Sequence, residues 1–338
     1  MAILITGGLG YIGSHTCVEL LNRGEDIIIV DNLHNSSMKV LSRIEAITGQ
    51  CPMFYRMDLN NESALSSVFD VHPIDAVIHF AGVKSVGESI EKPEFYYRNN
   101  LNATITLCRV MQAHGVRKLV FSSSAVVYSM ENEMPVHEGS ITGSCTNPYG
   151  WTKYMCEQIL RDIAKANPTW SVVLLRYFNP VGAHASGLIG ECPNGVPNNL
   201  MPYLTQTAIG KRPHLYVFGN DYDTPDGTGV RDYIHVTDLA EAHIAALDWA
   251  DHHHSIEIFN IGTGKGYSVL QLIDVFSKVN GVEVPYEITE RRAGDLAVCY
   301  ADPAKSEQLL GWKARKTLEE MCRDAWNWQK KNPNGYEG

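Results

Sequence analysis

Ser124, Tyr149 and Lys153 are the side chains of this sequence best suited to moving a proton. Tyr149 and Lys153 are spaced i, i+4 within Pro148–Lys153, so a helix there places both on one face. A phenol, with its usual pKa near ~10, is a poor base at neutral pH, and a neighbouring ammonium favours the phenolate. Ser124 follows the apolar run Leu119–Ser122 and could hydrogen-bond the same substrate oxygen. The three residues predict general-base catalysis by Tyr149.

A Tyr and a Lys at this spacing, taken alone, more often mark a solvated helix face. A second motif is therefore needed to favour the catalytic interpretation. Residues 7–13 read Gly-Gly-Leu-Gly-Tyr-Ile-Gly, directly after the apolar run Ala2–Thr6 and before a helical pattern. In such a unit Gly7 permits the tight turn, Gly10 lets the backbone approach a pyrophosphate, and Gly13 allows close helix–strand packing. The helix N-terminus then offers N–H groups to the phosphates. The motif predicts a dinucleotide, whose positively charged nicotinamide would further favour a phenolate.

Asp31 indicates which dinucleotide binds. It follows the apolar run Ile27–Val30 at nearly the spacing from Gly13 that is expected of an acid that binds the adenosine ribose. Its carboxylate would accept a hydrogen bond from the 2′-hydroxyl and repel a 2′-phosphate, and no Arg occurs in Asn32–Asn35. The sequence therefore favours NAD over NADP. The alternative is that Asp31 is a turn acid at a strand end and the glycines form an ordinary tight turn.

These motifs require a scaffold of alternating strands and helices. Helical patterns such as Tyr11–Arg23 and Phe95–His114 separate short runs of apolar and β-branched residues. The continuous apolar run Ile27–Val30 is typical of a parallel sheet that is covered on both faces. The alternation predicts an α/β fold with a doubly wound parallel (Rossmann) sheet. The predicted strands are Ala2–Thr6, Ile27–Val30, Met53–Met57, Ala76–Phe80, Leu119–Ser122 and Val172–Leu175.

The pattern changes after Asn179. A Gly-, Pro- and Asn-rich stretch at 182–197 leads into smaller helices and isolated strands, and the chain ends with a predicted helix at Leu318–Lys331. A chain of 338 residues is long enough for two unequal units. We predict an NAD-binding domain at residues 1–178 and a smaller mixed α/β substrate lobe at 179–338, with segments that can cross between the two.

Composition excludes several classes of protein. The hydrophobic share of 44% and the charged share of 20% are ordinary for a folded domain and exclude intrinsic disorder and collagen-like repeats. The net charge of −10, without a Lys/Arg cluster, disfavours a nucleic-acid or anionic-membrane partner. No apolar run approaches the roughly 20 residues of a membrane span, and Met1 leads directly into a strand without a signal-peptide pattern.

The cysteine and histidine patterns indicate neither a disulfide framework nor a metal site. The eight cysteines form no Cys-x-x-Cys motif, which favours reduced thiols in a cytoplasmic protein over disulfides or a zinc site. The run Asp251–His254 resembles a metal site, but adjacent side chains point in different directions and no second ligand cluster accompanies it. We therefore expect no metal ion and a cytoplasmic location.

Together, the motifs are similar to those of a known family. Over essentially its whole length the sequence resembles the extended short-chain dehydrogenase/reductases, and more closely their epimerase-like members. The motif Arg-Tyr-Phe-Asn-Pro-x-Gly-Ala at 176–183 and Asn-Asn-Leu at 198–200 separate those members from the rest. The matching segments are Gly7–Gly13, Asp31–Leu33, His79–Lys84, Ser122–Ser124, Tyr149–Lys153, Leu175–Ala183, Pro197–Leu200 and Gly229–Val236.

The resemblance implies C4 epimerisation of UDP-hexoses, interconverting UDP-galactose and UDP-glucose, with a tightly bound NAD that is regenerated each turnover. Tyr149 would take the proton of the sugar 4-hydroxyl while NAD+ takes hydride from C4. The 4-keto sugar would then rotate and receive the hydride on its other face. Because the sugar must turn while bound, binding energy should be concentrated on UDP. The family also implies a homodimer, paired through the helices around Phe95–His114 and Tyr149–Lys165.

The matched positions assign residues to three groups. The catalytic group is Ser124, Tyr149 and Lys153. The expected NAD contacts are Gly7, Gly10, Tyr11, Ile12, Gly13, Asp31, Asn32, Leu33, Asn35, Ser36, Asp58, Leu59, Phe80, Ala81, Gly82, Lys84, Asn99, Ser124, Tyr149, Lys153 and Phe178. The expected UDP-sugar contacts are Ser124, Tyr149, Phe178, Asn179, Asn199, Leu200, Leu215, Tyr216, Phe218, Arg231, Tyr233, Arg292, Asp295 and Cys299.

Within these groups, Arg231 and Arg292 suit a diphosphate because a guanidinium can bind it through two hydrogen bonds. The segment Leu215–Phe218 would offer its backbone and an aromatic edge to uracil. Asp58 is a plausible partner for the adenine amine. Taken singly, each Arg fits a surface ion pair equally well, and Asp58 fits a turn acid.

Four positions depart from the family pattern, and one of them, Ala103 where relatives often carry Gly, is a packing change at most. Val126 and Ser129 replace a Thr and a Gly that many relatives carry after the serines. Cys299 stands where relatives restricted to glucose and galactose commonly present a Tyr to the C2 substituent of the sugar. The smaller side chain leaves volume for an N-acetyl group, so we expect activity on UDP-GlcNAc and UDP-GalNAc as well. The alternative is a merely buried cysteine, with Tyr300 or Tyr216 filling the space.

Other functions within the family remain open. A nucleotide-sugar 4,6-dehydratase usually has Thr-Asp-Glu after the serine strand, whereas this chain has Ser124-Ala125-Val126. A net dehydrogenase would have to release NADH, which no feature of the sequence tests. A non-catalytic NAD-binding sensor would lack the Tyr or the Lys, and retention of both Tyr149 and Lys153 favours an enzyme.

Overall fold

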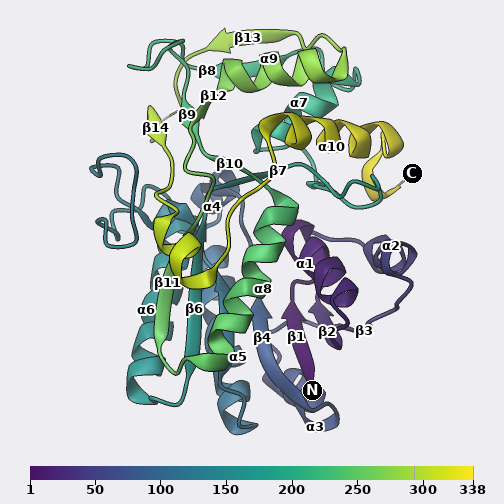
Figure 1. Ribbon diagram of the computed structural model, residues 1–338, viewed down its shortest axis with the longest axis vertical. Helices are drawn as coiled ribbons and strands as arrows, with labels where there is room; N and C mark the ends of the chain where they lie inside the picture. Colours follow the sequence, from purple (N-terminus) through teal and green to yellow (C-terminus); the bar gives the residue numbers. More distant parts are fainter. Residues whose placement is uncertain (293, 338) are drawn as a thin grey trace.

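A computed structural model describes residues 1–292 and 294–337 of the chain. A seven-stranded sheet with helices on both faces forms the larger part, and a smaller group of helices and strands lies beyond the end to which the strand arrows point (Figure 1). None of the helices in these residues combines the length and the apolar character that crossing a membrane would need.

The sheet is parallel throughout and has the strand order β11-β6-β5-β4-β1-β2-β3. From β1 the chain builds outward to β2 and β3, then returns to the other side of β1 for β4, β5 and β6. The reversal between β1 and β4 is a topological switch point, the usual ligand site of open α/β sheets. The predicted doubly wound Rossmann sheet is confirmed. Its strands are Ala2–Thr6 (β1), Ile27–Asp31 (β2), Met53–Arg56 (β3), Ile74–His79 (β4), Lys118–Ser122 (β5), Ser171–Tyr177 (β6) and Ile256–Ile261 (β11).

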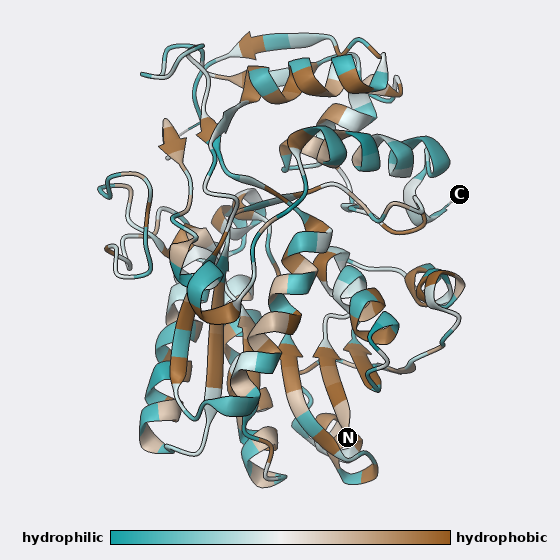
Figure 2. Cartoon of the chain, viewed as in Figure 1, coloured by the Kyte–Doolittle hydropathy of each residue, from teal (hydrophilic) through white to brown (hydrophobic). Residues whose placement is uncertain are grey.

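Two hydrophobic cores cover the two faces of this sheet. Along β1, Ile3 and Ile5 join one core while Leu4 joins the other, so both faces of the strand are buried. The strands are accordingly among the most hydrophobic parts of the chain (Figure 2). The helices of the first core are α1 (Tyr11–Asn22), α2 (Lys39–Thr48) and α8 (Val236–His252). Those of the second are α3 (Glu62–Val71), α5 (Pro93–Ala113) and α6 (Pro148–Ala166).

The smaller group of elements has a core of its own, which includes Leu204, Phe276 and Met321. Its helices are α7 (Leu200–Ala208), α9 (Val269–Asn280) and α10 (Leu318–Lys331). Its strand pairs are β7 (Asn179–Val181) with β10 (Tyr233–His235), β8 (Leu215–Phe218) with β13 (Tyr286–Thr289), and β9 (Val230–Arg231) with both β12 (Tyr267–Ser268) and β14 (Val298–Cys299). Shorter helical segments are α4 (Val86–Glu91), Ala125–Val127, Ser306–Leu310 and Gly335–Glu337.

Segments from the second half of the chain return to the large sheet. Helix α8 packs on the first core and β11 pairs with β6 at the sheet edge. Residues 236–261 are therefore part of the large sheet and the helical layer that covers it. The division of the chain after residue 178 stays a prediction.

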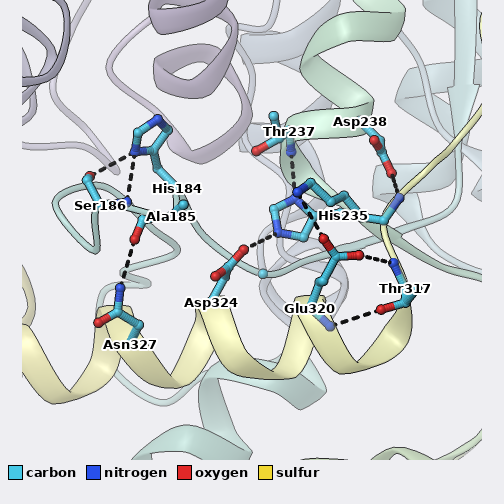
Figure 3. A network of polar contacts seen from close by, with 12 residues as sticks. His184, Ala185, Ser186, His235, Thr237, Asp238, Thr317, Glu320, Asp324 and Asn327 are labelled. Carbon is cyan, nitrogen blue, oxygen red and sulfur yellow. Dashed lines mark hydrogen bonds and ion pairs between the residues drawn. The ribbon is translucent and has the colours of Figure 1, made fainter.

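A polar network ties α10 to the beginning of α8 (Figure 3). His235 caps α8, because its Nδ1 accepts a hydrogen bond from the backbone N–H of Thr237 at 3.0 Å. Its Nε2 therefore carries the proton and donates to Asp324 of α10, 3.2 Å away. Asn327, one turn further along α10, donates to the backbone oxygen of Ala185 at 2.9 Å. These bonds fix the position of α10 relative to the sheet.

Candidate active site

The loop after β1 has the backbone of a phosphate cradle. Gly7 has a φ of +70°, and a Cβ there would come within 2.7 Å of the backbone nitrogen of Ala81. A Cβ on Gly13 would lie 2.4 Å from the oxygen of Gly7. Helix α1 begins at Tyr11, and its N-cap, Gly10, provides no side-chain hydrogen bond. The first-turn N–H groups are thus left for an anion, and the loop fits the pyrophosphate of a dinucleotide.

Asp31 is held beside this loop at the end of β2. It is 8% exposed, and its Oδ2 accepts a hydrogen bond from the backbone N–H of Leu9 at 3.1 Å. Its Oδ1 accepts from the N–H of Leu33 and from the hydroxyl of Ser36, both at 2.8 Å. Leu33 adopts a φ of +63°, which is uncommon for a residue other than glycine. The carboxylate is therefore oriented by the turn that follows it, and this arrangement is compatible with ribose binding.

Replacing Asp31 by Asn tests whether this carboxylate selects NAD. The amide keeps one acceptor oxygen for the turn but removes the charge that repels a 2′-phosphate. We expect the affinity for NAD to fall about tenfold and the preference for NAD over NADP to shrink by more than that. Isothermal titration of both dinucleotides measures the ratio. An unchanged ratio would contradict the assignment, and His34→Ala, a change at an exposed position of the same turn that leaves the charge intact, is the control.

Several further expected NAD contacts follow the carboxyl ends of neighbouring strands, whereas Asn99 lies within α5. Asp58 is exposed after β3, and its Oδ1 accepts from the N–H of Asn60 at 2.9 Å. Its Oδ2 accepts from the side chain of Asn32 at 3.3 Å. Asp58 thus acts as a turn acid here, and its contact with adenine stays a prediction. Lys84, after β4, forms an ion pair with Glu191 at 3.2 Å.

The predicted Ser/Tyr/Lys group is assembled where β5 ends. Ser124, Tyr149 and Lys153 are 7%, 6% and 8% exposed. The side chain of Asn147 caps α6 by accepting from the N–H of Gly150 at 2.9 Å, which fixes the first turn that bears Tyr149. The hydroxyl of Tyr149 interacts with that of Ser124. The structure therefore places Tyr149 beside Ser124, with Lys153 buried one helical turn further along α6.

The ammonium of Lys153 is held by the strand itself. Its Nζ donates to the backbone oxygen of Ser122 at 2.6 Å and lies 4.8 Å from the ring centre of Phe121. Burial lowers the pKa of Lys153 to about 8. Burial also raises the pKa of Tyr149 well above its usual value, and the contact with Ser124 opposes this rise. A phenolate therefore needs more positive charge nearby than Lys153 provides, such as that of an oxidised nicotinamide.

Several expected UDP-sugar residues gather around β9 and β14. Arg231 and Cys299 are partners in the strand register, and Arg231 lies 3.7 Å from Asp295. The guanidinium of Arg292 stacks over the ring of Phe218, 3.8 Å from its centre. Two guanidiniums are thus positioned by separate elements, and the carboxylate of Asp295 lies near both. This arrangement suits a diphosphate.

A second group lies nearer the sheet. Asn179 and Tyr233 are partners in the β7–β10 register. Asn199, which precedes α7, donates to Oε1 of Glu191 at 2.7 Å, and the same oxygen accepts from Lys84. Glu191 thus connects a residue expected to bind UDP-sugar with one expected to bind NAD. The sequence analysis did not single out Glu191, because a lone Glu in a loop has no local signal.

Three residues expected to contact UDP-sugar are either buried in a hydrophobic core or exposed beside another ring. Leu215 and Tyr233 are 2% and 3% exposed and belong to the core around α7, α9 and α10. Tyr216 is 40% exposed and packs its ring against His214. For Leu215 only the backbone is a candidate for uracil contact, as the sequence analysis anticipated. These contacts stay predictions.

The sequence analysis missed a buried ion pair below the site. Arg176 of β6 and Glu157 of α6 are joined by two hydrogen bonds, of 2.9 and 2.6 Å, and are almost fully buried. The hydroxyl of Ser123 donates to the same Glu157 at 2.6 Å. An Arg inside the apolar run 171–177 was the available signal. The pair links the helix that bears Tyr149 to the sheet.

Comparison with known proteins places this geometry in a family. The model described as "NAD dependent epimerase/dehydratase family" matches residues 3–262. The UDP-glucose 4-epimerase of Bacillus subtilis is 58% identical over 337 residues, covering 100% of this chain and 99% of that protein. The crystal structure of UDP-glucose 4-epimerase from Bifidobacterium longum in complex with NAD+ and UDP has a TM-score of 0.95 and 53% identity, covering 99% of this chain and 100% of that one. A structure from Stenotrophomonas maltophila with bound NAD and formylated UDP-arabinopyranose has a TM-score of 0.96 and 50% identity, covering 98% and 99%. The chain belongs to the NAD-dependent epimerase/dehydratase family.

Proposed function

We propose that this protein is a UDP-glucose 4-epimerase that interconverts UDP-galactose and UDP-glucose with NAD as its cofactor. The observation that supports this most is the buried group of Ser124, Tyr149 and Lys153 at the switch-point edge of a sheet that also bears a dinucleotide loop. The identity of 58% to a relative named UDP-glucose 4-epimerase, over the full chain, agrees with it.

NAD, when bound, would accept hydride from C4 of the sugar and return it. The chain's own task is to hold that cofactor in place. The glycine loop and the start of α1 would bind the pyrophosphate, and Asp31 would accept from the adenosine ribose. Because epimerisation involves no net oxidation, the cofactor has no need to leave, and we infer that it stays bound through many turnovers.

Tyr149 is the group that we assign to remove the proton of the 4-hydroxyl and to return it. Lys153 would keep positive charge one helical turn away, and its bond to the Ser122 carbonyl holds it there. Ser124 would hydrogen-bond the same sugar oxygen. Burial favours the neutral phenol, so once Tyr149 has taken the proton it holds a form that can give it back.

The UDP moiety would provide most of the substrate's binding energy. Arg231 and Arg292 would bind the diphosphate, with Asp295 close enough to Arg231 to orient its guanidinium. Asn179 and Asn199 are exposed and available as further hydrogen-bond partners. We expect the enzyme to make few contacts with the hexose itself, because the sugar must rotate between hydride removal and hydride return.

We further propose that the site admits an N-acetyl group at C2, so that UDP-GlcNAc and UDP-GalNAc are also substrates. Cys299 packs against a small buried cluster that contains Phe178, an expected contact of both NAD and sugar. The same cluster touches Ala125, the residue directly after Ser124. Cys299 would therefore lie near the reacting sugar, and a thiol there occupies less volume than a phenol.

The variant Cys299→Tyr tests this selectivity. We expect kcat/KM for UDP-GlcNAc to fall about 100-fold, because the larger ring would overlap the N-acetyl group, and that for UDP-galactose to change little. Cys299→Ser, which preserves size, should leave both substrates nearly unaffected. An equal loss on both substrates would refute the role of Cys299 in selectivity.

A homodimer and a cytoplasmic location stay predictions. Helices α5 and α6 pack against each other, and α5 exposes Phe95 and Ile105 by 38% and 39%. We propose that this helical face pairs with its copy, which would bury those apolar side chains. Analytical ultracentrifugation of the wild type and of Phe95→Glu/Ile105→Glu distinguishes a dimer from a monomer.

One incubation separates the candidate activities. Purified protein without added cofactor is mixed with UDP-galactose or with UDP-GlcNAc, and sugar stereochemistry is followed by NMR. Inversion at C4 supports the epimerase, and inversion of both sugars supports the broad specificity. A 4-keto-6-deoxy product would indicate a dehydratase, accumulation of NADH a net dehydrogenase, and unchanged sugars a non-catalytic NAD-binding protein.

A further inference from the structure

Residues 182–194, which follow β7, lie across the edge of the sheet that bears the dinucleotide loop, and we call them the strap. The Nζ of Lys84, in the loop after β4, donates to Oε1 of Glu191 at 3.2 Å. The side-chain amide of Asn194 donates to the backbone oxygen of His34, in the loop after β2, at 3.2 Å. Because β1 lies between β4 and β2 in the sheet, the strap passes over the end of β1, where the glycine loop begins.

The start of the strap contacts helix α1, which follows that loop. The hydroxyl of Tyr11, the first residue of α1, donates to the backbone oxygen of Gly182 at 2.8 Å. Further along the strap, Ile189 is 0% exposed and belongs to the hydrophobic core that contains α1. Contacts on both sides of β1 and on α1 thus place the strap around the dinucleotide loop.

The strap is bonded on its other side to α10 and to the residue directly after that helix. Backbone oxygens along the strap each accept a hydrogen bond from a side chain at 327–332, one of which, from Asn327, is seen in Figure 3. The pairs are Asn327 with Ala185 at 2.9 Å, Lys331 with Ser186 at 2.8 Å, Asn332 with Gly187 at 2.9 Å and Trp328 with Glu191 at 3.2 Å. These bonds follow the strap along most of its length.

The segment after α10 and helix α2 hold the middle of the strap. The hydroxyl of Tyr336, which is 8% exposed, accepts from the backbone N–H of Gly190 at 3.2 Å and donates to the oxygen of the same residue at 3.1 Å. The guanidinium of Arg43, on α2, lies 5.0 Å from the centre of the Tyr336 ring. It donates to the backbone oxygen of Leu188 at 2.7 Å and to Oδ1 of Asn332 at 2.6 Å.

We propose that the strap closes over the bound NAD and that Tyr336, together with Arg43, holds it closed and so slows release of the cofactor. This inference rests on the proposed binding of NAD by the glycine loop. Release requires the strap to lift from α1 and from the loops after β2 and β4, and its bonds to residues 327–336 oppose that movement. Tyr336 and Arg43 are thus positioning residues for the strap. A cofactor that returns to its starting state in each turnover has no need of a faster exit.

The first test measures how fast bound NAD exchanges with free NAD. Holoenzyme is mixed with an excess of carbon-13-labelled NAD, samples are desalted, and the label in the protein fraction is followed by mass spectrometry. Tyr336→Phe keeps the ring beside Arg43 and removes the hydroxyl that bonds to Gly190. We expect exchange about fivefold faster than in the wild type, the effect of about one neutral hydrogen bond. Arg43→Met, which removes two bonds, should accelerate exchange about tenfold.

Tyr55→Phe is the matched control for the loss of a tyrosine hydroxyl. Tyr55 lies on β3, and its hydroxyl bonds to the ring of His72 at 2.7 Å, outside the strap. A general loss of stability would raise the exchange rate in this variant as well, whereas we expect its rate to equal that of the wild type. Equal acceleration in Tyr55→Phe and Tyr336→Phe would overturn the proposal, and so would an unchanged rate in Tyr336→Phe.

A disulfide between the strap and the segment after α10 tests the opposite effect. A Cβ added at Gly335 would lie 3.8 Å from the Cβ of Cys192, the usual separation in a disulfide. Gly335 has a φ of +66°, so a cysteine there strains the turn. The comparison is therefore made between the oxidised and reduced forms of the same variant, Gly335→Cys. The oxidised form should exchange NAD at least about tenfold more slowly than the reduced form, and wild type treated in the same way should show no difference.

Equal exchange rates in the two forms, with the disulfide verified by mass spectrometry, would contradict the proposal. If the disulfide does not form, the comparison of Tyr336→Phe with Tyr55→Phe decides alone. Exchange is measured without turnover, so the strap can be refuted while epimerisation stands. Purified protein that neither contains nor binds NAD would instead refute the proposed function.

Discussion

Tyr149→Phe should lower kcat for UDP-galactose about 1,000-fold, the largest loss that we expect from any single substitution in this chain. The change removes one oxygen atom and keeps the ring, so the buried packing of Tyr149 at 6% exposure is preserved. What is lost is the only group that we assign to take the proton of the 4-hydroxyl. Steady-state kinetics with a coupled assay for UDP-glucose measures the loss.

Tyr154→Phe is the matched control for this substitution. Tyr154 lies on the same helix, and its ring packs edge-on against Trp151, away from the three assigned catalytic residues. We expect its kcat to stay within about twofold of the wild type. Both variants should still contain NAD after purification. A Tyr149→Phe enzyme with nearly full kcat would exclude Tyr149 as the base, whatever its cofactor content.

Arg176→Met should cause the largest loss of stability among the predicted variants, about 3 to 5 kcal/mol in the free energy of unfolding. Glu157 would remain as a buried carboxylate without its guanidinium partner, and only the Ser123 hydroxyl would still bond to it. Both side chains of the pair are 1–2% exposed, so water cannot easily replace the lost bonds. Urea denaturation followed by tryptophan fluorescence and by far-ultraviolet circular dichroism measures the change.

The double variant Arg176→Met/Glu157→Met distinguishes an unpaired buried charge from lost packing. Removing both charges should restore most of the stability, because apolar side chains of similar volume can replace a buried ion pair at little cost. The ion pair between Lys278 and Asp274 on the surface of α9 is the comparison for an exposed pair. Lys278→Met should change the free energy of unfolding by less than about 0.5 kcal/mol. Equal stability of Arg176→Met and the wild type would show that the ion pair is not important for folding.

Much of the sheet could be predicted because its signals are local. The run Ile27–Val30 is apolar at every position, since its side chains enter both cores in turn. The glycine loop and the pair Tyr149/Lys153 likewise depend on spacing within one or two elements. Strand β11 was missed because its pairing with β6 joins segments that are far apart in the sequence, and Asn260 interrupts its apolar pattern.

The parts of the site that escaped prediction depend on contacts between distant segments. The bond between Tyr336 and Gly190 spans 146 positions of the chain, and that between Glu191 and Lys84 spans 107. A tyrosine in the segment after α10 gives no sign of its partner until that segment is packed against the strap.

The most direct measurement follows the hydrogen at C4. UDP-galactose with deuterium at C4 is incubated with the purified protein in ordinary water, with no added cofactor, and the UDP-glucose formed is analysed by NMR and mass spectrometry. If the same hydride is taken up and returned within the site, the product keeps its deuterium at C4. Product with ordinary hydrogen at C4 would contradict hydride return by a retained NAD.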